Sequence, residues 1–140
     1  MSLENAAEVV RAVYAEWARG NFRAGTELYD PHAVLVIRED FPDAGVYVGR
    51  DEIRGYMRRF LADWTDAVIE AEDVLGARDS VAVAVHQHAT GSGSGALVDM
   101  RYWQVWTFRG GAVIRIESVR GRAEALQAVG VQEEPGDSRQ

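Results

Sequence analysis

Gln104 lies in a stretch, Leu97 to Arg109, whose side chains alternate between two chemically different faces. Because a strand points successive side chains to opposite sides, this alternation predicts a β-strand with one buried face. On the more apolar face, Gln104 is accompanied by Val98, Met100, Tyr102, Trp106 and Phe108. A buried amide needs hydrogen-bond partners or a ligand. We therefore interpret the strand as the back wall of a small-molecule pocket; the alternative is that Gln104 is tied to a nearby backbone group.

His86 and His88 stand two residues apart and therefore share one face of a second predicted strand. A His-x-His pair can begin a metal site, but no third ligand follows at a typical spacing, so we predict no metal. The other face of this strand carries only valines between residues 81 and 85, which favours an outer position for the histidines. The alternative is that His86 reaches the pocket at the strand end and contacts substrate as an acid or base.

The composition excludes several functional classes. A net charge of −7 and a pI near 4.9 argue against a nucleic-acid surface, which needs a basic patch. The absence of Cys excludes disulfides and thiolate catalysis, and every basic residue is Arg, which excludes a lysine Schiff base. The N-terminus resembles no leader and no stretch is long and apolar enough to span a bilayer, so we expect a cytoplasmic protein without membrane contact.

With 140 residues, the chain is long enough for one domain, predicted over 1–130, followed by a disordered tail over 131–140. Apolar spacing predicts helices over 5–18, 22–29, 50–64 and 122–129. Alternating or β-rich segments predict strands over 33–38, 46–48, 67–75, 80–90, 97–109 and 112–120, with turns between the last four. This order indicates an α+β fold, a cystatin-like cone in which a curved antiparallel sheet packs on three N-terminal helices.

A cone of this kind encloses a cavity between its helices and its sheet. Large aromatic side chains converge there from the first helix, the 50–64 helix and the long strand, although they could also form a solid core. For a lined cavity, the residues expected to contact substrate are Trp17, Arg38, Phe41, Tyr56, Phe60, Trp64, His86, Met100, Tyr102 and Trp106.

Three segments carry a family resemblance: VYAEWARGNFRAGTELYDPHAVL, VGRDEIRGYMRRF and VWTFRGGAVIRIESV. Their order resembles the nuclear transport factor 2-like superfamily, and within it the SnoaL-like polyketide cyclases, ketosteroid isomerases and limonene epoxide hydrolases. The resemblance covers roughly residues 5 to 128. It implies a dimer formed through the outer sheet face, where Trp103, Val105, Thr107, Val113 and Val119 would make the contact. Because the superfamily also holds non-catalytic modules, the fold does not settle the function.

The resemblance to ketosteroid isomerases implies a general-base Asp, and counting back from Gly49 places Asp40 at that position. Desolvation in an aromatic cavity would raise the pKa of this carboxyl, whereas the alternative is a solvated acid in an acidic loop. The oxyanion-hole acid of that family falls on Gln104, which can donate a hydrogen bond but cannot titrate. The family's helix-one Tyr aligns with Val13, one residue before Tyr14, so Tyr14 is either a hydrogen-bond donor to the substrate or a packing residue.

Limonene epoxide hydrolases place an Asp in the last strand, where this chain has Ser118, so their Asp-Arg-Asp arrangement is incomplete. Arg38 with Asp40, or Asp99 with Arg101, could imitate part of it, since residues two apart share one strand face. The prediction is a cofactor-free isomerase or cyclase acting on a hydrophobic polyketide- or steroid-like molecule, in secondary metabolism, with Asp40, Tyr14 and Gln104 as catalytic residues. The alternatives are an epoxide-opening hydrolase or cyclase and a non-catalytic ligand-binding or dimerisation module.

Overall fold

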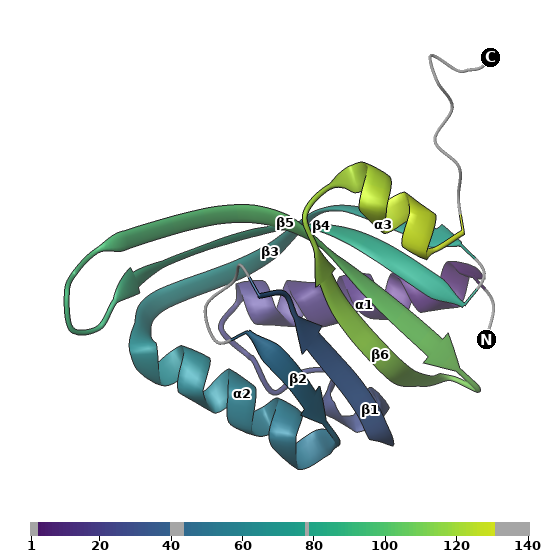
Figure 1. Ribbon diagram of the computed structural model, residues 1–140, viewed down its shortest axis with the longest axis horizontal. Helices are drawn as coiled ribbons and strands as arrows, with labels where there is room; N and C mark the ends of the chain where they lie inside the picture. The colour runs from purple at the N-terminus through teal and green to yellow at the C-terminus, as the bar shows by residue number, and fades with distance from the viewer. Residues whose placement is uncertain (1–2, 40–43, 78, 131–140) are drawn as a thin grey trace.

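The computed structural model describes residues 3–39, 44–77 and 79–130. The helices are α1 (Leu3–Ala18), α2 (Arg50–Asp63) and α3 (Arg122–Ala128), with a 3-10 turn, η1 (Thr26–Leu28). The strands are β1 (Tyr29–Ile37), β2 (Gly45–Val48), β3 (Trp64–Ala77), β4 (Ser80–Gly91), β5 (Leu97–Arg109) and β6 (Ala112–Val119). They form one curved sheet in the order β2-β1-β6-β5-β4-β3, with α1 and α2 packed against it (Figure 1). The α+β class and the cone are confirmed.

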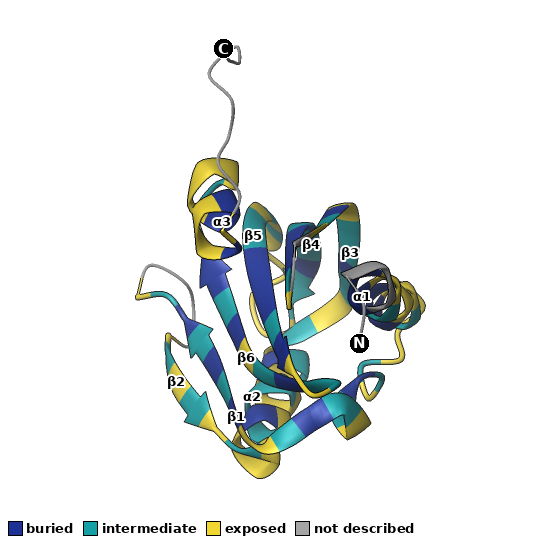
Figure 2. Ribbon diagram, turned by 90° about the vertical axis from the view of Figure 1, so that its right-hand side faces the viewer, coloured by how far each residue is buried: buried dark blue, intermediate teal, exposed yellow. Residues whose placement is uncertain are grey.

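Helix α1 forms because its apolar residues recur at helical spacing and give one buried stripe. Val10, Val13, Tyr14 and Trp17 are all buried, and α1 packs on β3 and β4. Helix α2 begins after Gly49, whose φ of 88° is a left-handed conformation that favours glycine. Both helices end within a residue of the predicted positions, and Figure 2 shows their buried sides turned toward the strands.

The prediction of a helix over 22–29 is wrong. This segment contains a single 3-10 turn, and β1 already begins at Tyr29. Gly25 has a φ of 90°, which no right-handed helix contains, and the backbone of Tyr29 is extended. The run of apolar residues in this segment is therefore too short to stabilise an α-helix that is interrupted by Gly25 and followed by Asp30-Pro31.

The sheet is mixed rather than wholly antiparallel. Strands β3 to β6 form an antiparallel meander, but β1 pairs with β6 in parallel, with Leu35 opposite Ile116. Side-chain periodicity identifies a strand but carries no information on its direction, so the sequence could not show this pair. The expectation of three N-terminal helices is also corrected, because the third helix, α3, comes after the last strand and packs on β5 and β4.

Helix α3 covers part of the outer sheet face that was expected to form the dimer contact. Val105 and Val119 are buried beneath it, in a cluster with Ala125 and Val129. Val113 lies in the main core, because a register shift between Thr107 and Phe108 reverses the alternation along β6. These three valines are therefore not available to a partner chain.

In the described residues, no helix has the length and apolar character needed to cross a membrane.

Candidate functional site

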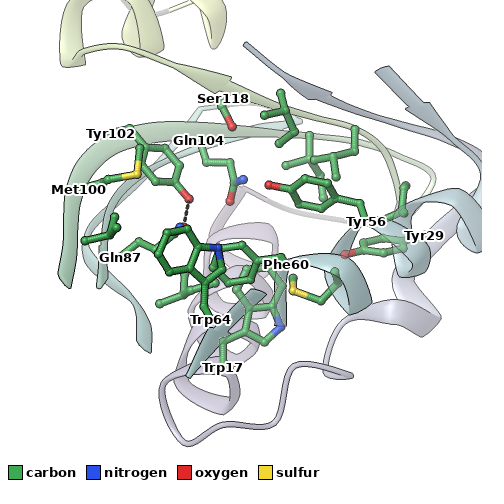
Figure 3. A pocket seen from close by; sticks show the side chains of 17 residues that line it. Trp17, Tyr29, Tyr56, Phe60, Trp64, Gln87, Met100, Tyr102, Gln104 and Ser118 are labelled. Carbon is green, nitrogen blue, oxygen red and sulfur yellow. Dashed lines mark hydrogen bonds between the residues drawn. The ribbon is translucent and has the colours of Figure 1, made fainter. Parts of the chain in front are cut away.

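A cavity of about 110 Å³ lies between the helices and the concave face of the sheet (Figure 3). Its walls come from α1, β1, α2 and all four strands of the meander, so residues from most of the chain meet there. The described lining residues are mostly aromatic or aliphatic: Trp17, Tyr29, Leu35, Ile37, Ile53, Tyr56, Met57, Phe60, Trp64, Ile69, Val98, Met100, Tyr102 and Ile116, joined by the polar Gln87, Gln104 and Ser118. The cavity thus combines an apolar wall with a few polar groups, as small-molecule sites do.

Gln104 is held at the cavity wall by a buried hydrogen-bond chain. The Trp106 indole donates to the Tyr14 hydroxyl across 3.1 Å, and that hydroxyl donates to Gln104 Oε1. An indole N–H can only donate, so the Tyr14 oxygen accepts from Trp106 and its single proton goes to Gln104. This fixes the amide with its oxygen toward Tyr14, and leaves the two N–H donors of Gln104 without a partner among the described residues. Gln104 is therefore positioned as a donor to a ligand.

Ser118 is the second polar group on this wall. It lies directly opposite Gln104 in the β5–β6 pair, and both line the cavity (Figure 3). Only 1% of Ser118 is exposed, and its Oγ has no hydrogen-bond partner among the described residues. A buried hydroxyl without a partner is costly, so such a group calls for a ligand or an ordered water. Directly opposed side chains have Cβ atoms about 4.5–5.5 Å apart, so Gln104 and Ser118 can both contact one ligand oxygen.

Aromatic rings fix the shape of the remaining wall. Trp17 donates its indole N–H to the carbonyl oxygen of Ala24 at 3.0 Å, which anchors the ring beside Tyr14, with ring centroids 4.8 Å apart. Tyr102 donates to Gln87 Oε1 at 2.8 Å, so its hydroxyl is engaged by the neighbouring strand. Because these rings are locked by hydrogen bonds as well as by packing, the cavity offers a preformed apolar surface.

Near this cavity, burial shifts the pKa of the buried Tyr14 and Tyr29 and of the half-buried Tyr102. Burial raises the pKa of Tyr29 to about 12, with the nearby charge of Glu27 contributing, and burial also raises the pKa of Tyr14 and of Tyr102 above their ordinary value. These hydroxyls therefore stay neutral at neutral pH, and those of Tyr14 and Tyr102 donate hydrogen bonds. Among the described lining residues there is no Asp, Glu, His or Arg, so the described part of the wall supplies donors and shape but no carboxylate base.

Of the residues predicted to contact substrate, Trp17, Tyr56, Phe60, Trp64, Met100 and Tyr102 line the cavity, together with Gln104. Tyr14 and Trp106 lie behind this wall rather than on it, and they hold Gln104 in place. Asp40 and Phe41 lie outside the described residues. Their predicted roles as base and as substrate contact therefore stay predictions.

Two predicted contacts are wrong in position. His86 lies opposite Arg101 on the outer face of the sheet, because in β4 its valine neighbours and Gln87 point inward. Arg38 follows the inward-pointing Ile37 and forms an ion pair with Glu124 at 2.8 Å, toward α3. His86 is sent away from the cavity by alternation along β4, and Arg38, one residue past the end of β1, is held away from it by its ion pair with Glu124.

Sequence reasoning missed several lining residues, most of them aliphatic. Gln87 could have been found, since it shares the parity of the buried valines on its strand. Ser118 was noticed only as a replacement for an expected Asp, although its alternation with Ile116 places it inward. Tyr29, Leu35 and the α2 residues Ile53 and Met57 carry no distinctive sequence signal, because core residues have the same types and spacing.

The chain is similar to proteins of known family and structure. A family model described as SnoaL-like domain matches residues 10–116. The chain is similar in structure to an NTF2-like protein from Burkholderia thailandensis, with 25% identity, a TM-score of 0.76, and 87% of this chain and 97% of that chain covered. A protein from a soil-derived mobile gene cassette is 26% identical, with a TM-score of 0.71 and coverage of 91% and 97%.

A third similar structure is a putative SnoaL-like polyketide cyclase from a Jannaschia species. It is 16% identical, with a TM-score of 0.71, and 93% of this chain and 94% of that chain are covered, so it supports the fold alone. No match was found among curated proteins.

Proposed function

Because the chain belongs to the SnoaL-like domain family, we propose that it is a cofactor-free isomerase or cyclase that acts on a hydrophobic, polyketide- or steroid-like small molecule. Its substrate site is the aromatic cavity between the helices and the sheet. The single observation that carries this proposal is the position of the Gln104 amide opposite the Ser118 hydroxyl: among the described residues, neither the Gln104 N–H donors nor Ser118 Oγ has a partner.

The two donors define the chemistry that the site favours. A substrate carbonyl oxygen accepts hydrogen bonds from Gln104 Nε2 and Ser118 Oγ. Removal of a proton from the carbon next to that carbonyl then moves negative charge onto the same oxygen, and fixed donors in a dry site stabilise this charge. Tyr14 and Trp106 act through Gln104 as positioning residues, since they hold the amide but do not line the cavity.

The catalytic base, Asp40, is assigned from the sequence alone, because it lies outside the described residues. Asp40 follows β1, whose Leu35 and Ile37 line the cavity, and it is the position at which the family resemblance implies the base. A carboxylate that enters this aromatic surrounding would have its pKa raised toward the range useful for proton transfer. The aromatic wall would hold the substrate in the shape required for ring closure or double-bond migration.

A non-catalytic ligand-binding module is the second candidate, favoured by one observation. The described lining residues include no carboxylate, so without Asp40 the site binds and orients a carbonyl compound but has no strong base. An epoxide-opening hydrolase is a variant of the first candidate that uses the same Asp40 to activate water.

The test compares wild type with Asp40→Asn. Tryptophan fluorescence is titrated with a panel of steroid and polyketide-like ketones, because Trp17 and Trp64 line the cavity, and conversion of each binder is followed by mass spectrometry. The proposal predicts that both proteins bind the same compound and that wild type converts it at least about 100-fold faster, the contribution typical of a positioned base. Binding without conversion by wild type would establish the binding module instead.

A further inference from the structure

The outer face of the sheet, opposite the cavity, carries a group of side chains that can bind a metal. Glu70 on β3 lies directly across from His86 on β4, and His88 lies two residues further along the same face. One ligand atom of each of the three residues lies within 4.8 Å of the other two. The sequence prediction of no metal rested on a missing third ligand. The structure provides that ligand from the neighbouring strand.

The distances are close to those of a metal site. His86 Nδ1 lies 3.2 Å from Glu70 Oε1, and His88 Nε2 lies 4.0 Å from the same oxygen. Ligand atoms bound tetrahedrally at about 2.0–2.1 Å from zinc are about 3.3–3.4 Å apart. The two separations from Glu70 Oε1 lie on either side of this value, and the ligand atoms of the two histidines lie within 4.8 Å of each other. Side-chain rotations that draw the two imidazoles together would bring the three atoms onto one ion.

A hydrogen-bond conflict at His86 points to a cation. Its Nδ1 faces Glu70, and its Nε2 faces Asp99 Oδ1 at 3.0 Å. Both partners are carboxylates, which accept only, whereas a neutral imidazole has a single N–H to donate. Two arrangements satisfy both contacts. A second ring proton makes both nitrogens donors, whereas a metal ion on the Nδ1 side lets Nε2–H donate to Asp99 while the Nδ1 lone pair and Glu70 share the ion. A carboxylate that holds the far nitrogen of a histidine ligand is the usual outer partner of zinc sites.

The surroundings favour a cation and leave it accessible. Glu70, Asp99 and Glu72 are acidic. The guanidinium of Arg101 lies among them, paired with Glu72 at 3.1 Å and 4.0 Å from Asp99. The His88 and Glu70 side chains are 41% and 44% exposed, so an ion can enter from solvent and keep an open coordination position.

We propose that Glu70, His86 and His88 form a binding site for a divalent transition metal ion of the zinc type, with Asp99 as the outer partner of His86. Two imidazoles and one carboxylate are a ligand set suited to such ions. The site links the edge strand β3 to β4, so a bound ion also stabilises that edge. It lies on the face opposite the cavity and is independent of the proposed function.

The test is calorimetric titration of the full chain, purified without a polyhistidine tag, with zinc chloride. Wild type is compared with His88→Ala, Glu70→Gln and, as a matched control, His32→Ala, which removes an exposed histidine of β1. Wild type and His32→Ala are expected to bind one zinc per chain. His88→Ala and Glu70→Gln are expected to lose at least about 10-fold in affinity, and Asp99→Asn about 10–100-fold.

Titration with cobalt in place of zinc gives a second measurement, visible absorption, that is independent of the heat of binding. A visible absorption band of wild type with cobalt that disappears in His88→Ala confirms direct coordination. The proposal is overturned if wild type binds no zinc, if His88→Ala binds it as tightly as wild type, or if His32→Ala loses binding. Circular dichroism of each variant establishes that lost binding is not lost folding.

Discussion

Tyr14→Phe removes the hydroxyl that connects Trp106 to Gln104, and its cost can be worked out from the structure. Tyr14 is only 1% exposed, so water cannot replace the lost group. The substitution leaves the indole N–H of Trp106 and Gln104 Oε1 without their partner. Each buried group left unsatisfied costs about 1–3 kcal/mol, and Gln104 can recover part of this by turning toward the cavity. We expect a net loss of about 2–4 kcal/mol in the free energy of unfolding.

The assay is urea unfolding, followed by circular dichroism and by tryptophan fluorescence, with Tyr29→Phe as the matched control. Tyr29 is also a buried tyrosine that lines the cavity, but its hydroxyl makes no hydrogen bond within the described part of the chain. Tyr29→Phe should therefore change the unfolding free energy by less than about 0.5 kcal/mol. Tyr14→Phe should also weaken binding of a ketone ligand, since the Gln104 amide is no longer held. A Tyr14→Phe protein as stable as Tyr29→Phe would refute the hydrogen-bond chain.

Two further predictions concern the same wall. Ser118→Ala removes a buried hydroxyl that has no described partner. The free energy of unfolding should therefore stay unchanged or rise by about 1 kcal/mol, while the affinity for a ketone falls. A decrease of more than about 1 kcal/mol in the free energy of urea unfolding would show that Ser118 Oγ has a hydrogen-bond partner in the protein. Burial raises the pKa of Tyr29 to about 12 from an ordinary value of 10.0, so this group contributes no pH dependence below pH 10 and lowers stability as the pH rises from about 10 to 12. Unfolding curves near pH 9 and pH 11 test the sign, and the drop between them should shrink in Tyr29→Phe.

Alternation along β5 predicted the part of the cavity wall that this strand forms, because one strand face is buried and each residue's side follows from its parity. Gln104 and Tyr102 were placed on the cavity wall for this reason, and they line it. The same rule applied to β4 favours an outer position for His86, since Val83 and Val85 are buried, and the alternative that His86 reaches the cavity at the strand end is wrong. The face on which the His86 side chain lies is decided by alternation along β4 and not by how near the residue is to the end of the strand.

Relations between strands could not be predicted from one sequence. The parallel pairing of β1 with β6 and the pairing of Gln104 with Ser118 depend on register and direction, which periodicity does not encode. Glu70 becomes a neighbour of His86 through the β3–β4 register, although 16 residues separate them in the chain. The chain that runs from Trp106 through Tyr14 to Gln104 likewise joins residues about 90 positions apart, and the sequence gives no signal of it.

The central claim is that Gln104 donates to a carbonyl oxygen of the substrate. The most direct measurement compares the affinity of wild type and Gln104→Leu for an apolar ketone and for the same molecule with a methylene group in place of the carbonyl. We expect wild type to prefer the ketone at least about 10-fold, since a hydrogen bond that satisfies a buried donor is worth about 1–3 kcal/mol, and Gln104→Leu to lose that preference while it still binds the hydrocarbon. An equal preference for the ketone in both proteins would contradict the account.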